Sequence, residues 1–114
     1  MPQAETTTEN AVSAAVVKYL QKQGWIADRV AVGMYYTIDK RPIRIGKPGQ
    51  PDWRFKHAKL GYLEVEMKRP GERPRGHQLE YIATMQAFGF AVTWADSLEM
   101  FKQWYGEHYP AAAV

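Results

Sequence analysis

The sequence has no cysteine among its 114 residues, and this absence excludes several classes of protein. Disulfide-stapled scaffolds, zinc sites built on thiolates and cysteine nucleophiles are all ruled out. No apolar run approaches the roughly 20 residues that cross a membrane, and residues 1–10 are polar, unlike a secretory signal peptide. We therefore expect a cytoplasmic protein that has no membrane partner.

The composition is that of one ordinary globular domain, with 46% hydrophobic and 24% charged residues. The formal net charge of +3 and a pI near 9.2 favour anionic partners such as nucleic acid, although many proteins are mildly basic. We expect a single domain over residues 1–114, with residues 1–7 and 109–114 as flexible tails.

The pattern of apolar residues, caps and turns predicts three helices and a small mixed sheet. Thr7 or Thr8 can cap a first helix that runs to about Gln23, with Gly24 as its stop. Asp96 or Ser97 can cap the last helix. Strands are expected at 25–31, 33–38, 52–55, 62–68 and 90–95, and a second helix at 77–88. This order predicts an α/β fold in which helices flank the sheet.

The most informative pattern is Pro51-Asp52 followed by Glu66-Met67-Lys68. In a strand over 62–68, Glu64, Glu66 and Lys68 share one face, and the apolar residues between them share the other. The short turn after Phe55 permits antiparallel pairing, which would bring Asp52 beside Glu66. Carboxylates can hold a hard divalent cation, and a nearby lysine can stabilise charge on a phosphate. The pattern indicates metal-dependent cleavage of a phosphodiester.

Each of these residues also has a plainer interpretation. Asp52 follows a proline, as in many turns, and the charged face of the strand is compatible with simple exposure to solvent. Glu9 lies one turn before an apolar helix stripe. Either it is simply an acid stabilised by the helix dipole at the N-terminus, or it supplies a third acid to a metal site. Glu64 is a second acid on the same strand face as Glu66. Taken together, the plain interpretations explain the pattern less well.

Two basic, proline-containing loops at 40–50 and 69–76 are candidates for binding a nucleic-acid backbone, with solubility as the alternative role. Their cations are Lys40, Arg41, Arg44, Lys47, Arg69, Arg73 and Arg75. Gln78 opens the helix after the second loop. Its amide is either an ordinary polar group of a first turn or a group that orients the lysine, a water or a phosphate.

The series Glu9, Gly49-Gln50-Pro51-Asp52, Glu66-Met67-Lys68 and Gln78 resembles the VRR-NUC (virus-type replication-repair nuclease) family of the PD-(D/E)xK nuclease superfamily. The resemblance implies a restriction-endonuclease-like core in which Glu9, Asp52 and Glu66 bind Mg²⁺ or Mn²⁺. It also implies catalytic roles for Asp52, Glu66, Lys68 and Gln78. Glu66 is preferred to Glu64 because a lysine follows it two residues later.

The resemblance further implies a small DNA endonuclease, bacterial or phage-encoded, that acts as a homodimer on branched DNA such as Holliday junctions. The residues themselves indicate no dimer interface. Three alternatives stay open: a nucleic-acid-binding module without catalysis, a sequence-specific restriction-type endonuclease, and a structural α/β domain.

Overall fold

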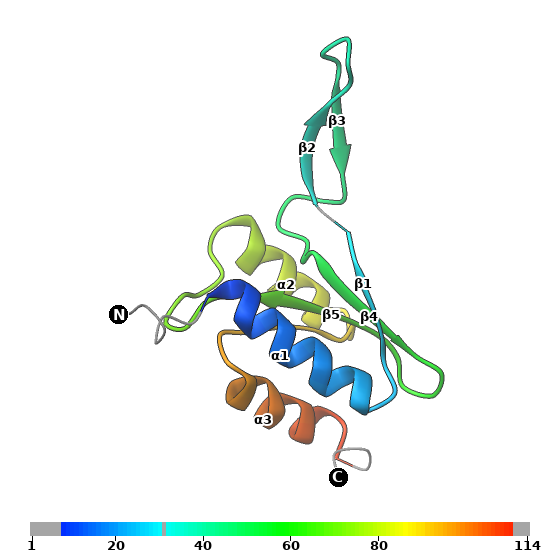
Figure 1. Ribbon diagram of the computed structural model, residues 1–114, viewed down its shortest axis with the longest axis vertical. Helices are drawn as coiled ribbons and strands as arrows, with labels where there is room; N and C mark the ends of the chain where they lie inside the picture. Colours follow the sequence, from blue (N-terminus) through cyan, green and yellow to red (C-terminus); the bar gives the residue numbers. More distant parts are fainter. Residues whose placement is uncertain (1–7, 31, 111–114) are drawn as a thin grey trace.

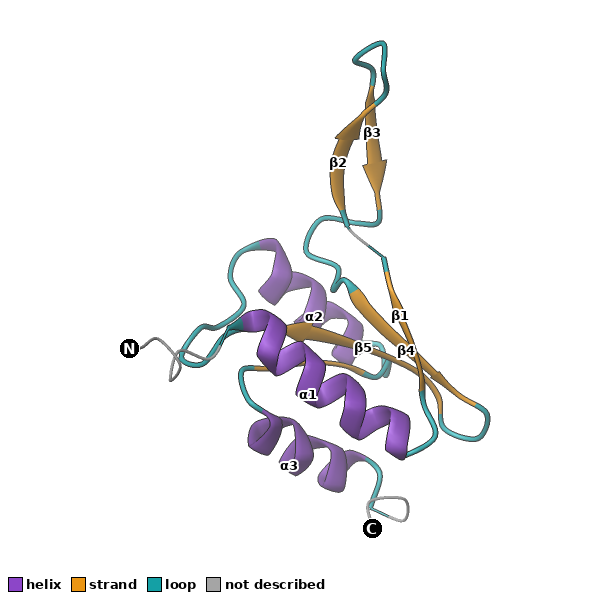
Figure 2. Ribbon diagram, viewed as in Figure 1, coloured by secondary structure: helices purple, strands orange, loops and turns teal. Residues whose placement is uncertain are grey.

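A computed structural model describes residues 8–30 and 32–110 and has a mixed α/β fold (Figures 1 and 2). Four strands form a sheet in the order β1-β4-β5-β6, and the other two form a sheet of their own. The elements in chain order are α1 (Glu9–Lys22), β1 (Ile26–Arg29), β2 (Gly33–Tyr36), β3 (Pro42–Ile45), β4 (Trp53–His57), β5 (Gly61–Met67), α2 (His77–Ala87), β6 (Val92–Ala95) and α3 (Leu98–His108). The predicted α/β fold with a small mixed sheet flanked by helices is confirmed.

The sheet combines antiparallel and parallel pairing. Strand β4 pairs antiparallel with both β1 and β5, as the short turn before Tyr62 predicts, whereas β5 and β6 run parallel. Parallel neighbours need a crossover, and α2 supplies it. Trp53 faces Val65 across β4 and β5. Continued by one residue, this register sets Asp52 opposite Glu66, which is the proximity that the sequence predicts.

The hydrophobic core lies between the sheet and the two helices α1 and α3. The predicted stripe of Val12, Val16 and Leu20 is buried on α1. Leu63, Val65 and Met67 of β5 are buried in the same core, together with Trp25, Phe55, Ala95, Phe101 and Tyr105. Because side chains alternate along a strand, Glu64 and Glu66 point to the opposite face, which α2 covers. Strand β5 therefore runs between α1 and α2 (Figure 1).

The helix ends follow local capping chemistry. Thr8 caps α1 because its Oγ1 accepts a hydrogen bond from the backbone N–H of Ala11 at 3.1 Å. Gly24, at φ +96°, turns the chain out of that helix. Of the two predicted caps of α3, Ser97 is the one that accepts from Met100 N. Among the described residues, none of the three helices is both long and apolar enough to cross a membrane.

The predicted loop over 40–50 is wrong in part, because β3 lies within it and pairs with β2 as a hairpin. The glycines and prolines of this segment favour a loop, but Ile43 and Ile45 alternate with Arg44 as in a strand. Pro42 is the first residue of β3, a strand position that tolerates the missing N–H. The hairpin projects away from the four-stranded sheet and the helices (Figure 1).

The tail predicted at 1–7 and residues 111–114 of the tail predicted at 109–114 lie outside the described residues. Tyr109, which the sequence assigned to the second tail, packs against the core. Its ring contacts Trp25 and Tyr105, with ring centroids 5.7 and 5.0 Å away respectively. Packing against the core therefore extends past the end of α3 to Tyr109.

Candidate active site

All five residues predicted to bind metal or to act in catalysis border one cavity of about 500 Å³. The cavity lies where the start of α1, the base of the β2–β3 hairpin, the loop before β4, the end of β5 and the start of α2 meet. Its lining includes Glu9, Asp52, Glu66, Lys68 and Gln78, together with Arg29, Gly33, Arg44, Gly49, Arg75 and His77. Residues that are 69 positions apart in the chain thus reach one space.

The centre of the cavity holds Glu66, Lys68 and Gln78 in contact. Lys68 Nζ lies 3.7 Å from Glu66 Oε2, and both side chains are largely buried, at 14% and 13% exposed. Gln78 Nε2 donates a hydrogen bond to the same oxygen at 3.0 Å. Glu66 on β5 and Lys68, the residue directly after that strand, share a face because side chains alternate along an extended chain, and Gln78 lies in the first turn of α2. The amide therefore orients the carboxylate directly.

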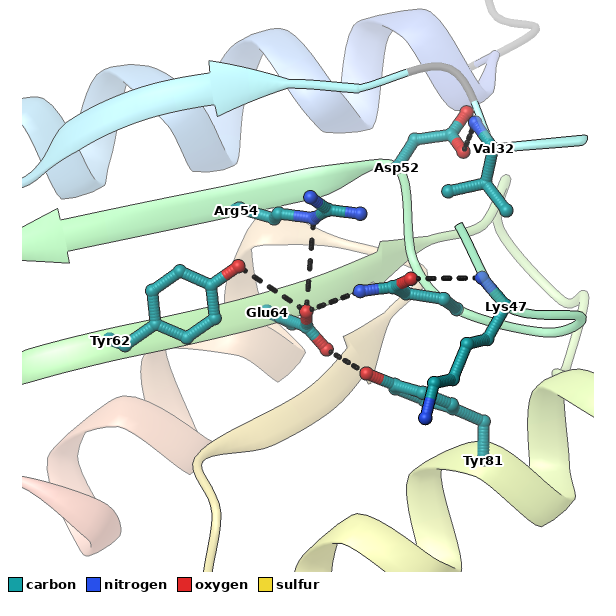
Figure 3. A network of polar contacts seen from close by, with 8 residues as sticks. Val32, Lys47, Asp52, Arg54, Tyr62, Glu64 and Tyr81 are labelled. Carbon is teal, nitrogen blue, oxygen red and sulfur yellow. Dashed lines mark hydrogen bonds and ion pairs between the residues drawn. The ribbon is translucent and has the colours of Figure 1, made fainter. Parts of the chain in front are cut away.

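Asp52 borders the cavity and also binds the backbone at the start of the hairpin. Its Oδ1 accepts from the backbone N–H of Val32 at 3.1 Å (Figure 3), and its carbonyl accepts from Val30 N at 2.9 Å. The plain interpretation of Asp52 as a turn residue is thus partly correct. The same carboxylate still borders the cavity, so the two interpretations do not exclude each other.

Arg29 is a cavity residue that sequence reasoning missed. Its Nη2 lies 3.9 Å from Asp52 Oδ2, and its guanidinium lies 5.4 Å from the ring centre of Trp53. The contact depends on the pairing of β1 with β4, in which Arg29 faces Trp53. No local motif announces that pairing, so the sequence held no signal for it.

Burial raises the pKa of Glu66 from its ordinary value of 4.5 to about 7. Lys68 opposes this rise, whereas the negative charges of Asp52 and Glu9 reinforce it. A carboxylate that is buried near two others is stabilised by any cation that enters. The cavity therefore has the electrostatic character of a cation site.

We expect the Glu66→Gln variant to be more stable than the wild type at pH 8, by about 2 kcal/mol, and by much less at pH 5. The raised pKa means that the folded protein binds a proton more tightly than the unfolded chain. Folding stability is therefore lost as the pH rises from about 4.5 to about 7. Glutamine cannot ionise and escapes this loss. Urea unfolding in EDTA at both pH values measures the difference in free energy of unfolding between the variant and the wild type. An equal difference at both pH values would contradict the prediction.

The three acids are not gathered as a ready set of ligands. Among residues 8–30 and 32–110, no three acidic or histidine side chains lie close enough together to hold one metal ion. Asp52 is turned towards Val32, and Glu9 is exposed at the start of α1. Magnesium, however, is commonly held by one or two carboxylates with water in its other positions. Asp52 and Glu66 meet that requirement by donor chemistry, with Glu9 nearby.

Glu64, the acid left open as an alternative, belongs to a different network (Figure 3). It is only 4% exposed and lies under α2. Its Oε1 accepts from the hydroxyl of Tyr81 at 2.7 Å, and its Oε2 accepts from Gln50 Nε2 at 2.9 Å. Arg54 Nε lies 3.8 Å from the same Oε2. These partners engage both oxygens, so we interpret Glu64 as the residue that ties the loop before β4 to α2.

The predicted nucleic-acid-binding cations are divided by the fold. Arg44 and Arg75 border the cavity, Lys47 lies just after β3, and Lys40 and Arg41 lie in the turn of the hairpin. Arg69 pairs with Glu72 at 3.0 Å, and Arg73 is exposed in the same loop. Of these predicted cations, Arg44 and Arg75 are therefore the best placed to meet a bound phosphate.

Comparisons with known proteins returned no similarity for this chain: no family model, curated protein or solved structure matches it. The resemblance to the VRR-NUC nucleases accordingly stays a prediction from residue pattern.

Proposed function

We propose that the protein is a Mg²⁺- or Mn²⁺-dependent DNA endonuclease built on a restriction-endonuclease-like core. The observation that carries the proposal is the cavity that Asp52, Glu66, Lys68 and Gln78 all border, with Lys68 and Gln78 against Glu66. A structural role alone gives no reason for a lysine, an amide and three acids to border one space rimmed by arginines. The same convergence supports an enzyme over a binding module that has lost catalysis.

The residues fit a magnesium ion, which Asp52 and Glu66 would hold, with Glu9 as a third acid. When bound, the ion supplies Lewis-acid polarisation of the phosphate and a more acidic water. Lys68 provides a fixed positive charge for the oxygens on which negative charge develops. Gln78 holds the Glu66 carboxylate in place. Arg44 and Arg75 bind the flanking phosphates without reading base sequence.

The preferred substrate in this proposal is branched DNA such as a four-way junction, cut by a homodimer. Two symmetric cuts need two sites, and a twofold dimer supplies them. The chain carries a single site of this kind in its described residues, which is why the proposal includes a second copy.

A cleavage assay tests the proposal. Linear, flapped and four-way-junction DNA are incubated with the protein in Mg²⁺, Mn²⁺ or EDTA, beside the Asp52→Asn variant. Asparagine can still accept the hydrogen bond from Val32 N, so the fold is retained while the charge is removed. We expect cleavage that needs metal and is lost in the variant. DNA binding without cleavage of any substrate would overturn the nuclease, and full activity of Asp52→Asn would overturn the site assignment.

A further inference from the structure

The β2–β3 hairpin is a structural unit with little support from the rest of the fold. Its two strands have four residues each and form a sheet of their own. It projects from the body of the molecule (Figure 1). A two-stranded hairpin alone is at best marginally stable in water, so a projecting one calls for a reason other than the stability of the domain.

The net charge of the whole chain is concentrated on this hairpin and its connection to β4. Residues 32–50 contain four of the 15 lysines and arginines but only one of the 12 acids. The remainder of the chain is therefore balanced, with eleven of each. The excess positive charge of residues 32–50 is +3, equal to the formal net charge of the chain, so this segment has a charge that complements a polyanion.

The turn of the hairpin is held by its own hydrogen bonds. Lys40 N donates to Thr37 O at 2.8 Å, and Thr37 N donates to Arg41 O at 2.9 Å. Lys40 takes the left-handed conformation, at φ +66°, which a three-residue hairpin loop requires at that position. Asp39, the acid of the segment, pairs with Arg41 at 3.0 Å. The turn is thus a defined structure whose negative charge is neutralised internally.

The turn also contains an exposed apolar side chain. Ile38 is completely exposed, and the neighbouring Tyr36 is 69% exposed. A β-branched apolar residue in a polar turn gains nothing for folding when it points into water. Apolar side chains at the end of a basic arm are what DNA-bending proteins insert between base steps. Aromatic side chains similarly stack on unpaired bases.

The arm is continuous with the candidate active site. Gly33 at the start of β2 and Arg44 on β3 both border the cavity. A DNA strand in the cavity would therefore also contact the base of the hairpin. The other candidate partner for the hairpin is a second copy of the chain. That copy would have to accommodate the four cations of residues 32–50.

We propose that the β2–β3 hairpin is a DNA-binding arm that inserts Ile38 at a branch point, where bases are unpaired or easily unstacked. This inference rests on the proposed function and deepens it: the arm, not the catalytic cavity, selects branched over linear DNA. Lys40 and Arg41 bind the backbone next to the inserted residue, and Arg44 binds it nearer the cavity. Branch points are the preferred target because unstacking costs least where stacking is already interrupted.

The test compares Ile38→Ser with Ile26→Ser, which replaces another exposed isoleucine on β1, within the four-stranded sheet. Junction DNA with 2-aminopurine at the branch is titrated in EDTA, where the fluorescence of the bound DNA reports unstacking. We expect the fluorescence rise of the wild type to be lost in Ile38→Ser and kept in Ile26→Ser. In magnesium, the ratio of junction to linear cleavage by Ile38→Ser should fall about tenfold, because linear cleavage is retained.

Three results would overturn the proposed DNA-binding arm. The first is that the wild type binds no DNA, and the second is that Ile38→Ser behaves as Ile26→Ser does. The third is that Ile38→Ser converts a dimer into a monomer while unstacking is unchanged. The last, measured by sedimentation, would make the hairpin an interface between copies. The fluorescence experiment needs no cleavage. A wild type that unstacks the branch but cuts no DNA in any metal would therefore overturn the nuclease and leave the arm standing.

Discussion

Replacement of Lys68 by alanine is expected to lower the rate of DNA cleavage by about 10²- to 10³-fold, with DNA affinity changed by less than about threefold. The ammonium lies 3.7 Å from Glu66 Oε2 and is 14% exposed, so it acts at short range in a partly dehydrated cavity. A positive charge in that position gains most when negative charge builds up on the phosphate. Single-turnover cleavage of saturating junction DNA in Mg²⁺ measures the effect on the chemical step.

The control is Lys59→Ala, which removes an exposed lysine from the turn between β4 and β5. It changes the net charge equally, so any general loss of attraction to DNA appears in both variants. Lys68→Arg is a second comparison, because it retains the charge and alters its shape. Equal rates for Lys68→Ala and Lys59→Ala would show that the cavity lysine takes no part in the reaction.

The loss of Lys68 should also change the acid beside it. The ammonium is the group that holds the pKa of Glu66 down against burial and against Asp52 and Glu9. Without it, a larger share of Glu66 is protonated at neutral pH and is unable to bind a cation. Between pH 7 and pH 9, the remaining cleavage activity of Lys68→Ala should therefore rise more steeply with pH than the activity of the wild type. In the proposed mechanism Lys68 and Glu66 would therefore act as a unit, and the effects of replacing them would not be additive.

The parts of the site that the sequence predicts are those set by local periodicity. Alternation along β5 and into the residue that follows it puts Glu66 and Lys68 on one face, and a short turn after β4 leaves antiparallel pairing as the simplest connection. The capped helix α1 likewise follows from Thr8, a four-residue apolar spacing and Gly24. These features depend on neighbours in the chain, so the residues themselves carry the information.

The parts that escaped prediction depend on contacts between distant segments. Arg29 reaches Asp52 only because β1 lies beside β4, a pairing across a long insertion. From the sequence, Glu64 is a possible metal ligand. The structure shows that Gln50 and Tyr81 bind its oxygens, and no residue near Glu64 in the sequence indicates those contacts. Strand β3 was missed because Pro42 and the glycines after it outweigh two isoleucines in any local scale. Tertiary packing decides all three.

Replacement of Gly49 by alanine is expected to destabilise the protein by about 3 kcal/mol, a fall in melting temperature of about 15 °C. Two costs combine. Gly49 has φ +83°, where a side chain is strained, and an added Cβ would lie 2.0 Å from the carbonyl oxygen of His77. That oxygen belongs to the backbone at the start of α2, so rotation of a side chain cannot relieve the overlap. Thermal unfolding followed by circular dichroism measures the loss.

Gly71→Ala separates the two costs, because Gly71 has nearly the same φ, +87°, and an added Cβ there meets no atom of the described chain within 4 Å. We expect it to cost only the strain, about 1 kcal/mol. The excess in Gly49→Ala measures how tightly the loop before β4 is held against α2. Relief of the overlap must move Gln50 and Asp52 away from Gln78, so metal-dependent cleavage should also fall at temperatures where the variant is folded. If both variants lost equal stability and kept full activity, close approach of loop and helix would not be what positions the site.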